Sequence, residues 1–457
     1  MGPLADPSVR TSRPDTEVVF DPDTYVRGVP HAAFARLRAR EAVSWVEELP
    51  VDSWPAGPGF WAVWRYAEVR AVLRDPATFS SHLGATQIRD PASPEDLAYV
   101  RRSMLNMDPP HHTRLRGLVA RSFTPRAVAA LEDRIERRAR AIVEGVAERG
   151  ECDFARVAAE LPLATLADVL GVPECDRSLL FDWASRVIGY QDEEYAAIDV
   201  TDRAAATPMA RAALAVRPLP GPDGRMPDPR TRGGIPDLYA YAHELAAHKR
   251  RHPGNDVMSI LLQQVDEAGG RISVAEFENM FWLFAVAGNE TLRNAIPGGM
   301  IALLEHPEER SRLERDRSLL PGAVEEMLRW WTPVIHFRRT ATRDCELAGH
   351  RIRAGQKVVV YFTSANRDRR VFAEPDRFDV GRSPNDHLAF GHGPHFCLGA
   401  HLARCQMRAL FAAVLDAFQD PEPAGEVVRL RSNFQNGVKH LPVRWRPRAG
   451  RRTDVRR

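Results

Sequence analysis

Apolar residues recur every three or four positions along most of the chain, the spacing that places them on one face of an α-helix. The longest stretch of this kind, residues 273–305, begins with Ser273 and Glu276 in the spacing of a capping box. Pro297 lies within it and cannot donate a backbone hydrogen bond, so we expect a kink or a break there. The same spacing predicts helices over residues 25–40, 112–121, almost throughout 125–188, and over 238–251, 256–266, 318–330 and 399–418.

The pattern changes after Pro333, where β-branched residues and short alternations of apolar and polar positions replace the helical spacing. A small sheet is predicted from residues 334–342, 345–352 and 357–362, and an earlier strand from 59–63. A turn-rich segment follows at 365–393, and residues 434–443 have the pattern of a hairpin. The predicted fold class is therefore mainly α with a small β part.

A polar tail at each end sets the predicted limits of the domain. The first 17 residues are polar and contain three prolines, which predicts a flexible tail, and the basic residues 448–457 form a second tail. Between them we expect one domain, residues 18–447. Within it, residues 203–236 contain seven prolines, and a loop of this length is typically either a functional lid or disordered. Both interpretations stay open.

Composition excludes several classes of protein. Among 457 residues, 63 Lys and Arg stand against 61 Asp and Glu, and the net charge of +2 argues against a nucleic-acid-binding protein. The five cysteines include no Cys-x-x-Cys pair and are too few for a disulfide scaffold. No apolar run at the N-terminus indicates a signal peptide or a membrane anchor. We therefore expect a reduced, cytoplasmic protein.

One cysteine stands in a setting that suggests metal chemistry. Residues 390–400 have the sequence FGHGPHFCLGA, so Cys397 lies in a glycine-rich loop directly before a helix. Backbone amides of such a loop and of a helix N-terminus favour a thiolate, which is the form that binds a metal. A lone cysteine is more often a buried, inert thiol, but the whole motif is far more specific than its cysteine.

The motif around Cys397 resembles the haem-ligand loop of the cytochrome P-450 superfamily, and the resemblance extends over nearly the whole chain. Glu326-Met-Leu-Arg329 is similar to the family's Glu-x-x-Arg helix, and Pro375-Asp-Arg377-Phe is similar to its meander motif. The resemblance implies heme b (iron protoporphyrin IX) held between a long central helix and this loop, with Cys397 as the metal ligand. It also implies a structural lock of Glu326, Arg329 and Arg377 beneath the loop, in which each buried charge needs its partner.

Further residues are assigned by the same resemblance. Ala287-Gly288-Asn-Glu290-Thr291 is similar to the family's oxygen-binding groove, where Glu290 and Thr291 would form an acid–alcohol pair that relays protons. The alternative is a solvated glutamate beside a threonine bonded to a helix carbonyl. The residues implied to contact the haem are Ala287, Gly288, Phe390 and Gly399, with His112, Arg116, Arg339 and His395 at its propionates. The neighbouring Arg114 and Arg338 are expected to be exposed surface charges.

A monooxygenase is the activity that the resemblance implies, one that inserts an atom of dioxygen into a hydrophobic small molecule. Electrons would come from NAD(P)H through a ferredoxin and a ferredoxin reductase, and the ferredoxin would dock near Arg114, Arg121 and Arg404 on the cysteine side. No nucleic-acid partner and no membrane anchor are expected. A peroxygenase or a non-catalytic haem-binding protein stays as an alternative, although neither needs the pair of Glu290 and Thr291.

The substrate class is indicated by four stretches, residues 104–110, 287–291, 331–334 and 432–440. They are similar to the bacterial group that oxidises sterols, branched lipids and terpenoids. Two features depart from that group. Leu292 follows Thr291 where a second threonine is common, and the proline-rich insertion at residues 203–236 is unusual. An oxidase that tailors a polyketide or peptide metabolite therefore stays as a rival. The predicted pocket is apolar and consists of Leu283, Phe284, Ala287, Val334, Ile335 and Phe434.

Overall fold

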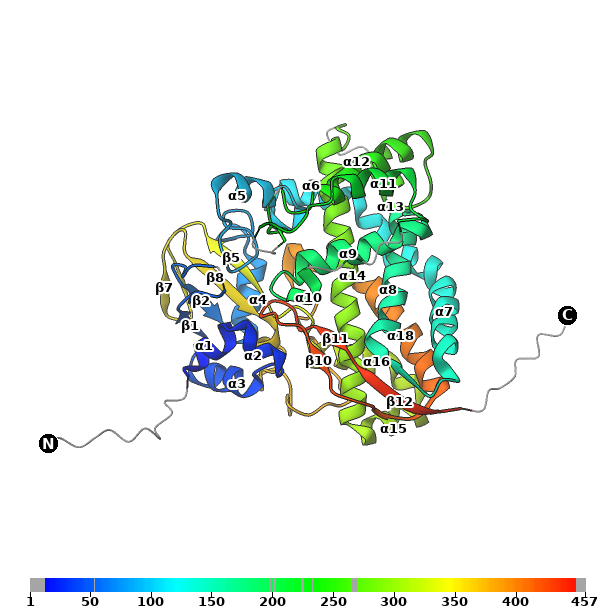
Figure 1. The fold of residues 1–457 in the computed structure, drawn as a ribbon. Coiled ribbons are helices and arrows are strands. Elements are labelled where there is room, and N and C mark those ends of the chain that lie inside the picture. The colour runs from blue at the N-terminus through cyan, green and yellow to red at the C-terminus, as the bar shows by residue number, and fades with distance from the viewer. Residues whose placement is uncertain are drawn as a thin grey trace.

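The structure is a computed structural model that describes residues 13–52, 54–196, 199, 203–222, 226–231, 233–264 and 269–448. Helices fill one side of the molecule and most strands lie on the other (Figure 1). The helices of the described residues are α1 (Asp15–Phe20), α2 (Pro22–Val26), α3 (His31–Arg40), α4 (Tyr66–Arg74), α5 (Pro94–Val100), α6 (His111–Ala120), α7 (Pro125–Ala147), α8 (Phe154–Leu170), α9 (Arg177–Ile188), α10 (Glu193–Ala196), α11 (Pro208–Ala215), α12 (Pro236–Arg251), α13 (Val257–Gln263), α14 (Val274–Glu305), α15 (Pro307–Arg315), α16 (Leu320–Trp331), α17 (Phe362–Ala365) and α18 (Ala400–Ala417).

The main sheet has five strands in the order β1-β2-β8-β5-β3, in which β2 runs parallel to β8 and the other neighbours are antiparallel. Its strands are β1 (Val43–Val46), β2 (Phe60–Val63), β3 (Phe79–Ser80), β5 (His336–Ala341) and β8 (Lys357–Tyr361). Every residue of β8 is buried, because alternate side chains face two separate hydrophobic clusters. Val358 and Val360 pack with α4, whereas Val359 packs with α3. The strands predicted within 59–63, 334–342 and 357–362 are confirmed, but residues 345–352 do not join this sheet.

Three smaller sheets complete the β part. They are β6 (Cys345–Leu347) with β7 (His350–Ile352), β10 (Val428–Arg429) with β11 (Val438–His440), and β4 (Glu151–Asp153) with β12 (Pro442–Pro447) and β9 (Phe418–Pro423). β11 and β12 follow one another but join different sheets, so the hairpin predicted at 434–443 is wrong. Asp153 binds the chain between these two strands. Its carboxylate accepts hydrogen bonds from the His440 ring at 2.7 Å and from the Leu441 amide at 2.9 Å.

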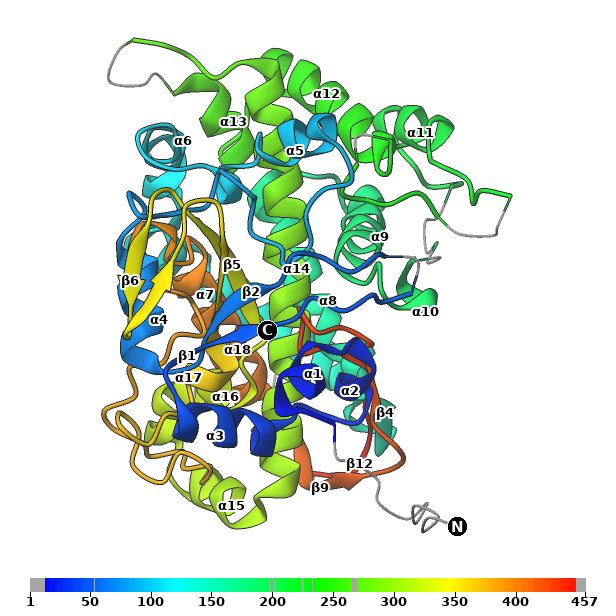
Figure 2. The same cartoon turned by 90° about the vertical axis from the view of Figure 1, so that its left-hand side faces the viewer.

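α14 runs through the middle of the helical side (Figure 2) and packs against α8, α9, α12 and α16. Ser273 and Glu276 form the predicted capping box at its start. The helix continues through Pro297, so the expected break does not occur. Its neighbour Gly298 packs so closely on α16 that a Cβ there would lie 2.1 Å from the Trp331 ring. Tertiary packing therefore keeps the helix continuous where the local sequence disfavours it.

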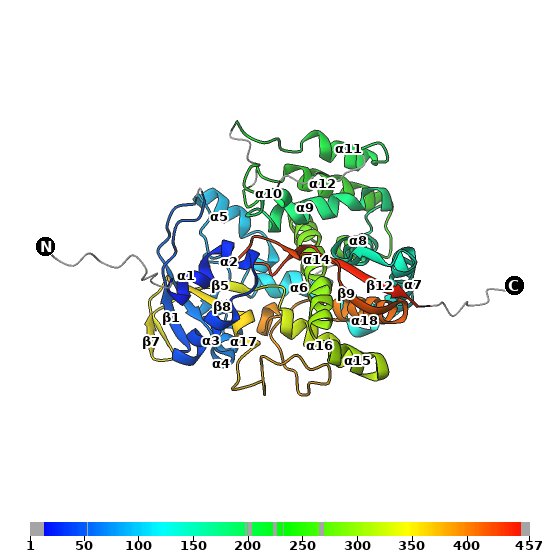
Figure 3. The ribbon, with the colours of Figure 1, turned by 60° about the horizontal axis from the view of Figure 1, so that its bottom comes forward.

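Three predicted segments differ from the structure. Residues 25–40 form two helices, because Gly28, with a φ of +130°, and Pro30 separate α2 from α3. Residues 203–236 are not a loop throughout, because Thr207 caps α11, which lies beside α12 (Figure 3). The predicted N-terminal tail overlaps α1, while residues 1–12 and 449–457 lie outside the described residues. Among the helices that are described, none is long and apolar enough to cross a membrane.

Candidate active site

The loop that carries Cys397 is folded against α4 and leads directly into α18. The Cys397 amide donates to the Phe390 carbonyl at 2.9 Å, which closes the loop. Gly391 and Gly393 both have a φ of +71°, and a Cβ at Gly393 would lie 2.3 Å from the Leu73 carbonyl oxygen. These glycines are therefore required by the backbone conformation and by close packing on α4.

The Cys397 thiol lies deep in the protein and yet is accessible. Burial raises its pKa, and the Gly399 amide and the guanidinium groups of Arg116 and Arg404 oppose that shift only in part. The protein groups alone therefore favour the neutral thiol, contrary to the expectation of a thiolate; a coordinating metal ion deprotonates such a group outright. The Cys397 side chain is nevertheless exposed, as is its neighbour Phe396 at 39%. A thiol that is surrounded by protein and yet accessible can be reached by a bound group.

A second accessible surface lies in the interior, on the central helix. Ala287 and Gly288 are exposed although the flanking Val286 and Asn289 are buried. On another side, Gly288 allows a close approach of α8, since a Cβ there would lie 2.9 Å from the Leu166 side chain. α14 is thus buried along most of its length and presents bare backbone and a single methyl group at this point.

The four groups predicted at the propionates come together in space. The rings of His112 and His395 lie 4.1 Å apart, and burial together with Arg339, His112 and Arg116 lowers the pKa of His395 to about 2. Burial lowers the pKa of Arg339 to about 10, and its guanidinium donates to the Arg338 carbonyl. Among the described residues, no carboxylate forms an ion pair with Arg116 or Arg339. The His112 Nδ1 atom is also buried without a partner.

These observations test whether the residues fit a haem. Arg339 is buried and Arg116 is half-buried, and a cation removed from water without an ion pair is unfavourable. The two propionates of a haem would supply carboxylates for such pairs. The accessible thiol provides a soft ligand for iron, and the bare segment at Ala287 and Gly288 offers a flat, close surface. The donor set and the exposed interior surfaces therefore fit the group that the sequence predicted.

Thr291 and Glu290 point in different directions. The Thr291 hydroxyl donates to the Ala287 carbonyl at 2.9 Å, and the residue lines a large cavity. Glu290 is fully buried, forms an ion pair with Arg293 at 2.5 Å and accepts from the Asn294 amide at 3.1 Å. Successive helical residues lie about 100° apart, so the structure does not bring the predicted acid and alcohol together.

The cavity next to Thr291 includes most of the predicted pocket. Leu283, Ala287, Val334 and Phe434 line it, as predicted. Phe284 and Ile335 do not. Phe284 faces the Phe123 ring at 5.8 Å, and Ile335 is fully buried among the core side chains of the sheet. The reason is periodicity, because Leu283 shares a helix face with Ala287 and adjacent residues of an extended segment point to opposite sides.

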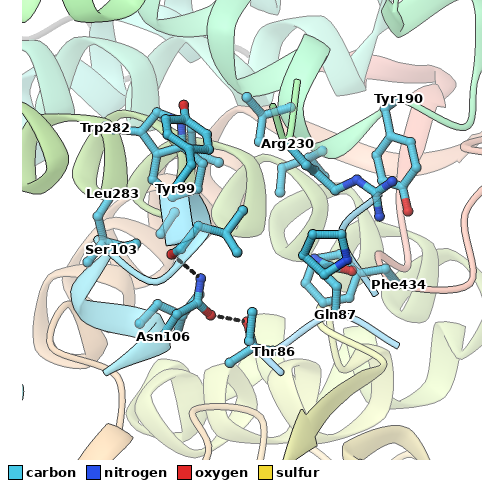
Figure 4. Close-up of a pocket in the computed structure, with 18 of the residues that line it drawn as sticks. Thr86, Gln87, Tyr99, Ser103, Asn106, Tyr190, Arg230, Trp282, Leu283 and Phe434 are labelled. Atoms are coloured by element: carbon cyan, nitrogen blue, oxygen red, sulfur yellow. Dashed lines mark hydrogen bonds between the residues drawn. The ribbon is translucent and has the colours of Figure 1, made fainter. Parts of the chain in front are cut away.

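Several residues of the cavity wall were not predicted. Thr86, Tyr99 and Asn106 come from the segment between β3 and α6, whose sequence has no regular pattern that could have revealed them. Figure 4 shows Asn106 beside Thr86, whose hydroxyl donates to its amide oxygen at 2.8 Å. Trp282 and Phe337 complete this group. The proline-rich insertion also contributes, through Asp228, Arg230 and Thr231.

Of the two arginines in the turn that carries the predicted meander motif, Arg382 and not the predicted Arg377 contacts Glu326. Arg329 donates twice to the fully buried Glu326 at 2.7 Å, and Arg382 Nε lies 3.1 Å from both carboxylate oxygens. The Arg377 side chain is 59% exposed and pairs with Glu374. The turn instead directs the Arg377 carbonyl toward Arg329 and Arg382. The motif therefore located the correct segment, but backbone conformation decides which arginine reaches inward.

The other predicted surface arginines also differ in their surroundings. Arg338 is buried and pairs with Asp90 at 2.6 Å, so the expectation that it is exposed was wrong. Arg114 forms an ion pair with Glu276 at the start of α14. Arg404 pairs with Glu325 at 2.7 Å and lies over the Phe390 ring of the cysteine loop. Arg121 is exposed.

Comparison with known proteins places these features in context. A family model described as Cytochrome P450 matches residues 241–439. Steroid C26-monooxygenase of Mycobacterium tuberculosis is 39% identical over 428 residues, which is 93% of this chain and 91% of that protein. Methyl-branched lipid omega-hydroxylase of Mycobacterium bovis is 38% identical over 424 residues, or 91% of each chain. The solved structure of a Mycobacterium marinum cytochrome P450 in complex with pseudoionone is similar with a TM-score of 0.79 and 37% identity, covering 92% of this chain and 96% of that one.

Proposed function

The chain belongs to the cytochrome P450 family and is a haem-dependent monooxygenase, and we propose that Cys397 is the residue that binds the haem iron. Three observations support this assignment: the loop closed by Phe390, the accessible thiol, and the Gly399 amide beside it. When bound, the haem supplies the redox chemistry that activates dioxygen.

The cluster beside the loop is proposed to hold the propionates. Arg116 and Arg339 would pair with the carboxylates, while His112 and His395, which burial keeps neutral, would donate or accept single hydrogen bonds. His112 and Arg339 are buried and Arg116 and His395 are half-buried, so the four groups are held in place by the surrounding protein. The cluster would therefore orient the cofactor as well as bind it.

Thr291 is the proposed proton-handling residue. Its hydroxyl already donates to the Ala287 carbonyl at 2.9 Å, so its oxygen lone pairs remain available to a proton donor in the cavity. Glu290 would contribute only by leaving its ion pair with Arg293, whose guanidinium also lies over the rings of Phe181 and Tyr195. In this conformation Glu290 forms an ion pair with the buried Arg293, whereas Thr291 faces the cavity in which the substrate is proposed to bind.

The proposed substrate is an elongated hydrophobic molecule such as a sterol, a terpenoid or a branched lipid. The observation that carries this proposal is the wall that α14 forms along the cavity from Asn279 to Thr291. At 1.5 Å per residue this wall is about 18 Å long. Val334, Phe337 and Phe434 add apolar surface to the cavity, whose lining also includes the polar side chains of Thr86, Asn106 and Gln435. The names of the two relatives, a steroid C26-monooxygenase and a methyl-branched lipid omega-hydroxylase, support the same class.

A titration tests the substrate class. Sterols, terpenoids and methyl-branched fatty acids would be added to the ferric protein while the Soret band is followed. We expect a shift toward the high-spin form with members longer than about 12 Å and weaker shifts with short ones, because short ligands leave part of the wall uncovered. If no member of the panel shifts the band, the substrate is of another class, and an oxidase that tailors a polyketide or peptide metabolite becomes the better account.

Electrons are proposed to come from NAD(P)H through a ferredoxin and its reductase. The exposed Arg121 next to α6 offers a positive charge for an acidic partner. Arg404 lies on the same side of the molecule as Cys397, but its charge is neutralised by the ion pair with Glu325. Arg114 contributes less than predicted, because it pairs with Glu276. A cytoplasmic location, where NAD(P)H is supplied, stays a prediction.

A further inference from the structure

Three segments that are far apart in sequence meet at the outer part of the cavity. The Arg230 guanidinium carbon lies 3.6 Å from the centre of the Trp54 ring and 4.9 Å from that of the Tyr190 ring. The two rings are 5.5 Å apart. Arg230 belongs to the proline-rich insertion, Trp54 to the turn between β1 and β2, and Tyr190 to the segment that directly follows α9. The contact therefore joins the insertion to the body of the protein.

The guanidinium is held so that its face remains free for the rings. Asp228 accepts hydrogen bonds from Arg230 Nε at 3.0 Å and Nη2 at 2.7 Å, and also from the Arg230 amide at 2.9 Å. This carboxylate occupies the edge of the guanidinium, and cation–π attraction acts through the ring faces. The Arg230 side chain is only 16% exposed, so water weakens this attraction little.

Trp54 is in turn contacted by a second arginine of the cavity wall. Arg89 lies 5.4 Å from the Trp54 ring and donates to the carbonyls of Leu49 and Pro55, which lie in the same turn as Trp54. Arg89, Tyr190 and Arg230 all line the cavity, and Figure 4 shows Tyr190 and Arg230 together on the side away from Trp282 and Leu283. The contact is thus part of the cavity wall.

We propose that Arg230 determines which molecules reach the cavity, because its stack on Trp54 and Tyr190 holds the segment 228–231 across the outer end. The proposal rests on the proposed function, since it takes the cavity beside Thr291 as the substrate site. A large molecule passes only when Arg230 separates from the two rings, whereas a small one passes without that step. Arg230 is therefore a specificity-determining residue rather than a catalytic one.

The test compares a small and a large probe in the haem-loaded protein. Association of imidazole and of 4-phenylimidazole would be followed by stopped-flow absorbance in the variants Arg230→Gln, Arg230→Lys and Trp54→Leu. Loss of a partly desolvated cation–π contact corresponds to roughly 5- to 30-fold in rate. We expect 4-phenylimidazole to associate faster by this factor in Arg230→Gln and Trp54→Leu and less so in Arg230→Lys, with imidazole unchanged. Arg203→Gln serves as the matched control, because Arg203 lies in the same insertion but is 61% exposed.

A second readout needs no haem. Hydrogen exchange of residues 226–231 should accelerate in Arg230→Gln and not in Arg203→Gln. If exchange accelerates while both probes associate at wild-type rates, the stack only fastens the insertion and the proposal is wrong; unchanged exchange also contradicts it. If Cys397 does not bind haem iron, every variant loses the absorbance signal alike. In that event the association rate of Nile red, followed by its fluorescence, decides the proposal by the same comparison.

Discussion

The proposed proton-handling role of Thr291 can be tested with two substitutions, one that removes its hydroxyl group and one that keeps it. Its hydroxyl bonds to the Ala287 carbonyl and its side chain lines the cavity. We expect Thr291→Ala to bind haem and substrate normally but to lower product formation roughly 100-fold and to release peroxide, because protons are no longer delivered in order. Thr291→Ser should retain most of the activity. Product and peroxide per NAD(P)H consumed are the measurements, and a wild-type ratio in Thr291→Ala contradicts the assignment.

Arg382 and Arg377 lie in the same turn, and the structure and the sequence motif assign the contact with Glu326 to different ones. The structure indicates Arg382, and the motif indicated Arg377. Arg382 is nearly buried against Glu326, whereas Arg377 extends into solvent. Arg382→Ala leaves a buried carboxylate with one partner fewer, and we expect it to lower the free energy of unfolding by about 3 kcal/mol or more. Arg377→Ala should change it by less than about 1 kcal/mol. Urea denaturation and haem retention measure both variants, and equal effects would refute the assignment of Arg382.

At the residue scale, the sequence predicted which residues belong to the site better than it predicted where their side chains point. Cys397, Glu326 and Arg329 follow from short motifs whose chemistry leaves few alternatives. Phe284 and Ile335 were misplaced because one residue of error along a helix or strand turns a side chain away from the cavity. Arg377 was predicted from its motif and Arg382 was not predicted at all, because which of two arginines in a turn reaches inward depends on backbone angles that no pattern specifies.

At the scale of elements, long periodic helices were predictable and their exceptions came from tertiary contacts. α14 has its predicted start because Ser273 and Glu276 act locally, and it passes Pro297 because Gly298 packs closely on α16. α11 was missed because the surrounding prolines dominate the local pattern. Its cap, Thr207, is fixed by Asp176, a partner 31 residues away that accepts its hydroxyl at 2.6 Å.

The contact between α16 and α18 predicts a pH dependence. Burial would raise the pKa of Glu325, but hydrogen bonds from His387 and Arg404 lower it to about 2. A carboxyl group with a lowered pKa stabilises the fold above its unfolded pKa of about 4.5, and this contribution is lost as the pH falls toward 2.

We therefore expect Glu325→Gln to lower the free energy of unfolding by about 2 kcal/mol near pH 6, a figure reduced for partial exposure. The difference from the wild type should shrink between pH 4.5 and pH 2. Denaturant unfolding across this range measures it, with the exposed Glu308→Gln as the control. A difference that stays constant down to pH 2 would show that the ion pair contributes nothing through its charge.

At the scale of the whole molecule, the sheet and the helical side both contribute to one cavity. β5 and the segment after β10 supply apolar residues, α14 supplies a long wall ending at Thr291, and the insertion covers the outer part. The family could be predicted from sequence because its motifs are local. The course of the insertion could not, because it depends on Arg230 meeting Trp54 and Tyr190 across the fold.

The roles proposed above depend on Cys397 as the ligand of the haem iron, and the absorption spectrum of the reduced, CO-bound protein reports the identity of that ligand. We expect the wild type and Cys405→Ser to show the long-wavelength Soret band that distinguishes thiolate from histidine or water ligation, because Cys405 is buried in α18 and serves only packing. Cys397→Ser should lose that band while circular dichroism shows an intact fold. A folded Cys397→Ser protein that keeps the thiolate band would contradict the account.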